Sequence, residues 1–453
     1  MRPLGFMLFC LLTSLSISCA YGTSYGPHNP HNHSTELMIA FSGEETGYLE
    51  PCGCEKTPMG GIAKRHSLFL SIQQGNQTVL PLGLGDLTGH WKRQDEIKME
   101  TLVQALGEMQ YVLHNLGEKD LGMGPEVLSY VFYSSPVKLL SSNILLSETL
   151  GIKVYPYIIR DVMVDDRQIK IGILGVLSPK LLGTTPWGVE IIPPSEAIGP
   201  LIQELKDMDL LILLSHADLE ESRRLAEAFP EFQLVISGHN IDHPIVTTVG
   251  ETIVATSGNK GKYIGLFRYR PHDGKTHLEM VTLDDHYTDS SQMLALLTNY
   301  QQRLKDEDLL GRVEKFSNTE GFTYAGNTIC GTCHQATFLH WKTTAHALAY
   351  ETLVRVGHDY DPECVSCHVT GLYYESGFTS LEKTPGLKGT GCEGCHGPGS
   401  QHVEMALKGL KTDGYGKLEP RDCKTCHDPE HSSQFQYEDY WQRITHPKEQ
   451  PKG

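Results

Sequence analysis

The sequence predicts an α/β domain followed by a smaller, mainly α-helical domain, on three observations. Short apolar strands alternate with helical segments from residue 36 to about residue 285. Apolar residues then recur at helical spacing from residue 290 to residue 316. Beyond residue 321 the chain is rich in glycine and carries four copies of Cys-x-x-Cys-His. Alternation of strands and helices is typical of an α/β fold, and its abrupt end marks a second domain.

The first twenty residues have the composition of a secretory signal. Arg2 precedes an apolar run from 4 to 17, which is too short to span a membrane, and small residues follow. We therefore expect residues 1–20 to direct export and residues 21–35 to form a flexible leader. Lipidation at Cys19 would add a membrane anchor, and cleavage after Ala20 is the alternative.

Residues 36–288 are predicted to form the α/β domain. Apolar runs indicate strands at 37–41, 78–85, 168–176, 209–215 and 234–237, and helical periodicity indicates helices at 62–74, at 95–109 and from the fourth strand to 229. Segments 252–256 and 263–269, joined by a glycine-rich turn, are expected to be antiparallel edge strands. The segment 290–316 is expected to be a helix broken near Gly311, so residues 289–320 form a connector and residues 321–453 the second domain.

The four Cys-x-x-Cys-His motifs are typical of covalent haem attachment. Two thiols one helical turn apart can each form a thioether to a haem vinyl group, and the adjacent histidine then binds the iron. Structural zinc sites do not need a histidine directly after the second cysteine. The sequence therefore predicts four covalently bound haem c groups, attached at Cys330 and Cys333, Cys364 and Cys367, Cys392 and Cys395, and Cys423 and Cys426, with His334, His368, His396 and His427 as proximal ligands.

The second axial ligands are expected to be mostly histidines. Residues 321–453 hold six histidines besides the four proximal ones, and a single methionine, Met405. Methionine can therefore ligate one haem at most. Ligation by two histidines lowers the reduction potential relative to ligation by histidine and methionine.

Residues 325–447 resemble the tetrahaem cytochrome c-554 family of multihaem c-type cytochromes. The resemblance rests on the first three motifs with their flanking residues 341–347, 369–371 and 397–402, and on the closing segment 440–446. It implies a mainly α domain packed around haems, with His346 and His402 as distal ligands. We expect His446 to be a third, and His431 or His358 a weaker fourth. The type member has one haem without a strong distal ligand, so an open iron is the alternative.

Residues 36 to about 285 resemble the calcineurin-like metallophosphoesterases, in the bacterial 5′-nucleotidase branch. The resemblance rests on the order and spacing of 60–65, Gly85-Asp86, Ser215-His216 and Gly238-His239. It implies a four-layer α/β sandwich, in which helices cover the outer faces of two stacked sheets.

Several residues depart from that family's metal-binding pattern. The positions of one metal's ligands carry Glu44, Thr46, Asp86 and Ile241, and those of the other carry Asp86, Leu116, His216 and His239. Gly117 stands where the family has its catalytic histidine. A two-metal displacement needs a full ligand shell on each side, so ordinary phosphoester hydrolysis is not expected. Asp86, His216 and His239 could still hold one divalent metal, and the alternative is that they only satisfy loop hydrogen bonds.

Cys52 and Cys54 are the two cysteines outside both the haem motifs and the signal region. They follow the first strand, near the expected site, and are the candidates for a catalytic role. They could form a strained, easily reduced disulfide or donate soft ligands to a metal. A structural disulfide or two unused thiols are the alternatives.

The net charge of −17 argues against nucleic acid and anionic membranes as partners. The leading hypothesis is an exported electron-transfer protein, periplasmic or on the cell surface, whose degenerate phosphoesterase-like domain serves docking or a redox substrate. Its partner would be a basic redox protein or an acceptor outside the cell. One alternative is a metal-dependent hydrolase or sulfur-compound enzyme coupled to the haems, and another is a subunit that oligomerises into an extracellular cytochrome assembly.

Overall fold

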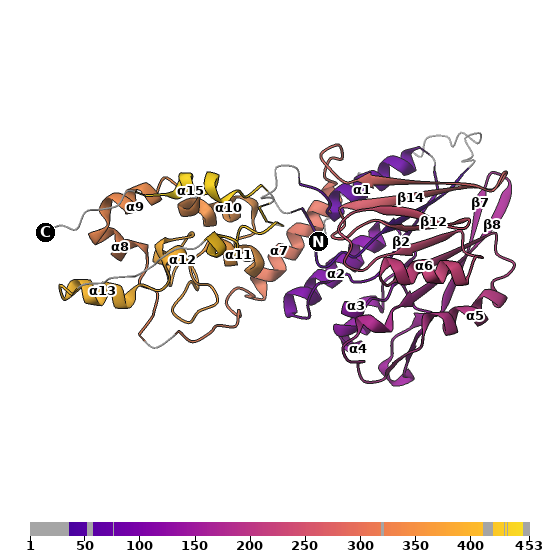
Figure 1. The fold of residues 1–453 in the computed structure, drawn as a ribbon, viewed down its shortest axis with the longest axis horizontal. Helices are drawn as coiled ribbons and strands as arrows, with labels where there is room; N and C mark the ends of the chain where they lie inside the picture. The colour runs from indigo at the N-terminus through magenta and orange to yellow at the C-terminus, as the bar shows by residue number, and fades with distance from the viewer. Residues whose placement is uncertain are drawn as a thin grey trace, which may run out of the picture. The chain divides into compact units, whose positions relative to one another are not determined.

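Two β-sheets pack face to face in residues 36–288, which we call the N-terminal domain (Figure 1). The computed structural model describes residues 36–51, 58–75, 77–318, 321–410, 420–429, 431–432 and 434–446. Cys19, Cys52 and Cys54 lie outside these described residues. The roles predicted for these three cysteines therefore stay predictions.

The first sheet has seven strands in the order β15-β14-β1-β2-β3-β4-β6. Strands β1, β2, β3, β4 and β6 run parallel to one another. Strand β14 pairs antiparallel with β1, and β15 pairs antiparallel with β14. Their bounds are Leu37–Ser42 (β1), Val79–Gly83 (β2), Leu113–Asn115 (β3), Lys138–Leu140 (β4), Val154–Tyr155 (β6), Tyr263–Arg270 (β14) and Lys275–Thr282 (β15).

The second sheet has six strands in the order β12-β13-β11-β10-β8-β7, of which the inner four are parallel. Their bounds are Tyr157–Val164 (β7), Arg167–Leu177 (β8), Leu210–His216 (β10), Leu234–Ser237 (β11), Ile245–Val249 (β12) and Thr252–Thr256 (β13). A small antiparallel pair joins Ile144–Leu146 (β5) and Val189–Ile191 (β9).

Apolar side chains fill both faces of the central strands. Leu37, Ile39 and Phe41 of β1 pack with Ile171 of β8 and Ile212 of β10 in the core between the sheets. Because side chains alternate along a strand, the residues between them face outward and need a second cover. Helices supply it on both sides, so the domain is a four-layer sandwich and the predicted fold class is confirmed.

The helices divide between the two outer faces. Those on the first sheet are Ile62–Gln74 (α1), Arg93–Glu108 (α2) and Ser291–Asp306 (α7), and those on the second are Pro194–Glu204 (α5) and Leu219–Ala228 (α6). Two short helices, Glu118–Gly122 (α3) and Pro125–Phe132 (α4), follow β3. Helix α7 ends at Asp306, ahead of the break predicted near Gly311.

The prediction that 252–256 and 263–269 form antiparallel edge strands was wrong. β13 lies in the second sheet between β11 and β12, whereas β14 lies in the first sheet between β1 and β15. The glycine-rich turn between them crosses from one sheet to the other. Local alternation of apolar residues predicts a strand but does not say which sheet it joins.

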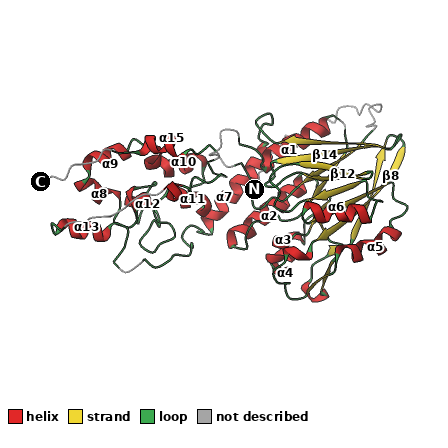
Figure 2. Cartoon of the chain, in the orientation of Figure 1, coloured by secondary structure: helices red, strands yellow, loops and turns green. Residues whose placement is uncertain are grey.

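The region beyond residue 321 is helical and contains isolated bridges but no named strand among its described residues (Figure 2). Its helices are Asn327–Cys333 (α8), Gln335–Trp341 (α9), Ala349–Val356 (α10), Pro362–His368 (α11), Cys392–His396 (α12), Ser400–Leu407 (α13), Pro420–Cys423 (α14) and Tyr437–Ile444 (α15). The predicted mainly α character is confirmed. In the described parts of the chain, every helix is too short or too polar to cross a bilayer.

Helix α11 contacts the N-terminal domain through two side chains of α2. Lys98 Nζ lies 2.6 Å from Glu363 Oε2, and Gln94 Nε2 donates to Asp361 Oδ1 over 2.8 Å. Both acidic residues closely precede Cys364 in the chain. One haem motif is thereby tied to a helix of the α/β sandwich.

Candidate functional site

Each Cys-x-x-Cys-His motif lies on a short helix or at the end of one. Helix α8 ends at Cys333 and α14 at Cys423, while α11 and α12 run through complete motifs. A helical turn places the two thiols of a motif on one side, as attachment to a single porphyrin requires. None of the eight motif cysteines, all of them described residues, forms a disulfide.

Three of the four motif histidines face a second imidazole. The ring centroids lie 6.1 Å apart in the pair His334 and His402, and 6.0 Å apart in the pairs His346 and His427, and His396 and His446. Two imidazoles bound to one metal from opposite sides, each about 2 Å away, would place their centroids roughly 6 Å apart. The residues therefore fit haem iron held between two histidines.

The structure thus brings each of the three predicted distal histidines to one motif. Sequence reasoning named His346, His402 and His446 without saying which motif each would serve. His402 faces the first motif, His446 the third and His346 the fourth. The sequence separations, from 50 to 81 residues, show why local patterns could not assign the pairs.

The histidine of the second motif, His368, stacks on no imidazole among the described residues. Its Nδ1 lies 2.7 Å from the carbonyl oxygen of Ala349 and 3.3 Å from Thr352 Oγ1. A hydrogen bond from Nδ1 to a carbonyl orients the ring and leaves Nε2 to bind a metal. His346 also lies near His368, because His368 contributes, after burial and His427, to lowering the pKa of His346. The ring of His346, however, is paired with His427.

The two weaker candidates for a fourth distal ligand have carboxylate partners. His358 Nε2 lies 3.2 Å from Glu50 Oε1, and His431 Nδ1 lies 2.8 Å from Asp428 Oδ2. Neither imidazole stacks on His368 among the described residues, although His431 lies close enough to Cys367 of the second motif to lower the pKa of that thiol.

The four motifs form a contiguous series. The thiols of Cys330 and Cys392 lie within hydrogen-bonding range of each other, and so do those of Cys367 and Cys426. Burial, followed by the nearby Cys423, raises the pKa of Cys395 to about 11. The first motif therefore neighbours the third, the third the fourth, and the fourth the second.

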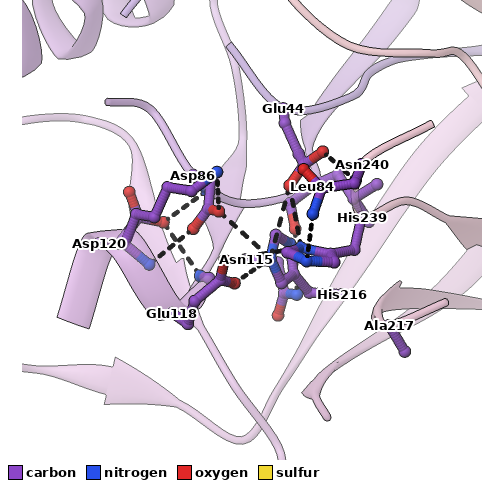
Figure 3. A network of polar contacts seen from close by, with 12 residues as sticks. Glu44, Leu84, Asp86, Asn115, Glu118, Asp120, His216, Ala217, His239 and Asn240 are labelled. Carbon is purple, nitrogen blue, oxygen red and sulfur yellow. Dashed lines mark hydrogen bonds and ion pairs between the residues drawn. The ribbon is translucent and has the colours of Figure 1, made fainter. Parts of the chain in front are cut away.

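A separate cluster of carboxylates and imidazoles lies at the carboxyl ends of parallel strands in the N-terminal domain (Figure 3). Glu44 follows β1, Asp86 follows β2, and Glu118 begins the helix after β3. His216 ends β10 and His239 follows β11, both in the other sheet. Because carboxyl ends of parallel strands gather at one edge, both sheets contribute to the same site.

The ligand atoms of this cluster converge. Oxygen and nitrogen atoms of Glu44, Asp86, His216 and His239 all lie within 4.8 Å of one another. Glu118 joins them, with Oε2 2.7 Å from His216 Nε2 and Oε1 3.5 Å from His239 Nδ1. The sequence-predicted metal ligands Asp86, His216 and His239 are thus brought together with two further carboxylates.

The electrostatics of the cluster follow from opposite charges at close range. Burial alone would lower the pKa of His216, but the carboxylates of Asp86 and Glu118 raise it well above its usual value. Burial alone would raise the pKa of Asp86, but His216 and Lys119 lower it below its usual value. Burial would likewise raise the pKa of Glu44, and His239 and His216 lower it. These charges compensate one another inside a buried site.

The residues present fit a single divalent metal ion. Among the described residues, Glu44 Oε1, Asp86 Oδ2 and His239 Nδ1 are buried without a hydrogen-bond partner. The charged atoms within 4 Å of them belong to the other side chains of the cluster and to Lys119. Converging carboxylate oxygens and imidazole nitrogens are the donors that zinc, manganese and ferrous iron bind.

The backbone around the cluster is held by specific hydrogen bonds. Asp120 accepts from the amides of Asp86, Leu87 and Gly117 over 2.9 to 3.0 Å. Asp86 and Asn240 have positive φ angles of 55° and 53°. Among residues other than glycine, aspartate and asparagine adopt positive φ most readily, so both suit these tight loops.

Two features of this site escaped sequence reasoning. Glu44 was placed with the degraded metal position, but the structure brings it to His239, at 3.2 Å. Glu118 is not among the metal ligands that the sequence predicts. The signal that could have found it is the carboxylate directly after the lost histidine, at the start of a helix behind a parallel strand.

Comparison with known proteins separates the two halves of the chain. Residues 329–397 match the family model Cytochrome c554 and c-prime. Cytochrome c-554 of Nitrosomonas europaea is 40% identical over 114 residues, covering 22% of this chain and 48% of the relative. The resemblance of the C-terminal part to that family is confirmed, and covalently bound haem c is the cofactor that it implies.

The N-terminal domain matches proteins of the 5′-nucleotidase kind. Protein 5NUC of Lutzomyia longipalpis is 23% identical over 282 residues, covering 54% of this chain and 48% of the relative. The 5′-nucleotidase precursor of Thermus thermophilus superposes with a TM-score of 0.53 at 19% identity, covering 71% of this chain and 68% of that one. At this identity the likeness shows the fold alone. The chain spans about half the length of both curated relatives.

Proposed function

We propose that this chain is an exported tetrahaem c-type cytochrome that transfers electrons, with the phosphoesterase-like domain as a docking or redox module. The observation that carries the proposal is the set of three imidazole pairs whose spacing fits one iron each. Bound haem c would supply reversible one-electron chemistry. Thioether attachment takes place outside the cytoplasm in bacteria, which supports export.

The placement of the motifs supports transfer along a series. The order first, third, fourth, second makes neighbours of motifs that are far apart in the chain. His368, at one end of the series, lies on the helix that contacts the N-terminal domain through Lys98 and Gln94. An electron partner at this end would therefore lie next to the sandwich.

The partners follow from the charge. A net charge of −17 favours a basic redox protein or an acceptor outside the cell over nucleic acid. A lipid at Cys19 would hold the chain at a membrane surface, and the periplasm or the cell surface is the compartment that we propose.

The test counts haems and open irons on the purified full chain. Pyridine haemochrome analysis should give four haems, and low-temperature EPR should give three low-spin centres and one high-spin centre. Carbon monoxide should bind one haem per chain, because only His368 lacks a second imidazole among the described residues. A fully loaded protein without a reversible redox couple would refute electron transfer.

The cluster in the N-terminal domain favours a second candidate, a metal-dependent hydrolase or sulfur-compound enzyme linked to the haems. Its motivating observation is the convergence of Glu44, Asp86, His216 and His239. Asp86→Ala should abolish turnover of phosphoester or thiosulfonate substrates while haem spectra stay normal. If neither substrate class is turned over by the metal-loaded wild-type protein, this candidate fails for those classes.

A further inference from the structure

Lys119 places an ammonium group inside the carboxylate cluster. Its Nζ lies 3.3 Å from Asp86 Oδ2, and its backbone amide donates to Asp86 Oδ1 over 2.9 Å. The side chain is 22% exposed, whereas Asp86 is fully buried. Lys119 is therefore fixed against the central carboxylate by both its main chain and its side chain.

The position of this ammonium matters because of how two-metal sites are built. Two ions bridged by a carboxylate lie about 3.5 to 4 Å apart, and each needs its own further ligands. Asp86 Oδ2 lies 3.5 Å from His216 Nε2 and 3.3 Å from Lys119 Nζ. The ammonium thus contacts the same oxygen that would otherwise be shared with a second ion.

The charges of the cluster balance with one divalent ion. Glu44, Asp86 and Glu118 supply three negative charges, and Lys119 supplies one positive charge. A single divalent ion, bound by neutral His216 and His239, cancels the remainder. A second divalent ion would leave a net positive charge in a mostly buried site, which is unfavourable in a low dielectric.

We infer that the N-terminal site takes one divalent transition-metal ion, and that the Lys119 ammonium stands in place of a second. The ion would be held by Asp86, His216 and His239 with carboxylate help from Glu44 and Glu118. Thr46 and Ile241 stand at two ligand positions of the other metal and offer no imidazole to bind a second ion. This inference concerns metal content and does not depend on electron transfer or on any hydrolysis.

The stoichiometry of Mn²⁺ tests the inference on the full haem-loaded chain. Manganese is the probe because thiolates bind it weakly and it is distinct from haem iron. After treatment with a chelator, titration calorimetry and elemental analysis should give one Mn²⁺ per chain, and EPR should show an isolated ion. No bound Mn²⁺, or two per chain with the EPR of a coupled pair, would overturn the inference.

A variant of the ammonium gives a second, independent readout. Lys119→Gln removes the charge at similar length, so the dissociation constant for Mn²⁺ should fall by about tenfold or more as repulsion is relieved. Lys180→Gln is the matched control, because Lys180 pairs with Glu221 at 2.8 Å on an exposed surface. Unchanged or weaker Mn²⁺ binding by a folded Lys119→Gln protein would contradict the role assigned to Lys119.

Discussion

Gly117 stands where the resemblance to the phosphoesterases implies a histidine, and the structure leaves no room there for a larger side chain. A Cβ atom at this position would lie 2.1 Å from Asp86 Oδ1 and 2.8 Å from the Asp86 amide nitrogen. The loop that contains Gly117 therefore lies directly against Asp86 and leaves no space for a side chain at this position.

We predict that Gly117→Ala destabilises the protein by about 1 to 3 kcal/mol, because the added methyl group must displace Asp86. Gly199→Ala is the control, since its Cβ would meet nothing within 4 Å and it lies inside helix α5, where alanine is preferred. Urea denaturation followed by far-ultraviolet circular dichroism measures both. Equal stability of the two variants would contradict the close approach of Gly117 to Asp86.

The imidazole pairs make a prediction for single histidines. His346→Ala should convert one low-spin haem to a high-spin one, because His427 would keep only its own bond to the iron. The number of haems that bind carbon monoxide should rise from one to two per chain. His358→Ala should leave the spectra unchanged, because His358 pairs with Glu50. Identical spectra for wild type and His346→Ala would remove His346 from the ligands.

Helix α11 shows how one residue can serve both an element and the contact between elements. Asp361 caps the helix by accepting from the amide of Glu363 over 3.0 Å, and it also accepts from Gln94. The helix carries Cys364, Cys367 and His368, so its N-terminus is held close to the point where a haem would be attached.

We predict that Asp361→Ala costs about 2 kcal/mol, of which the lost cap accounts for roughly 1 kcal/mol and the lost hydrogen bonds from Gln94 and Gln301 for the rest. Haem occupancy of the second motif should fall, as measured by mass spectrometry of the haem peptide. Asp218→Ala removes a cap of the same kind from α6, where the side chain accepts from Glu221 over 2.7 Å. If Asp218→Ala lowers haem occupancy equally, the effect is not local to α11.

Buried apolar side chains are distributed unevenly along the chain. The N-terminal domain builds three extensive apolar clusters across its four layers. In the haem-motif region, the apolar cluster found among the described residues has eight buried members, one of which, Leu310, precedes that region. A region with so few buried side chains needs another source of buried surface, and porphyrins would supply it.

We predict that chain produced without haem attachment keeps the N-terminal domain folded and loses the rest. Limited proteolysis with mass spectrometry should leave a resistant fragment ending near residue 310, with cleavage beyond residue 321 at least about tenfold faster than in the haem-loaded protein. The haem-loaded protein is the control. A resistant C-terminal region in the haem-free chain would show that side chains alone suffice.

The sequence by itself determined the features that depend on neighbouring residues. The four motifs, the supply of histidines, the alternating strands and helices and the missing Gly117 side chain are all local patterns, so they could be predicted. The confirmed fold class followed from the same patterns, since period and composition set which faces are buried.

Only the tertiary structure decided which residues meet. In the folded chain His402 faces His334, Glu44 and Glu118 lie in the metal cluster, and Lys119 contacts Asp86. It also sent β13 and β14 into different sheets. Local propensity sets the conformation of a segment, but distances between segments depend on how their apolar faces pack together, and no single segment contains that information.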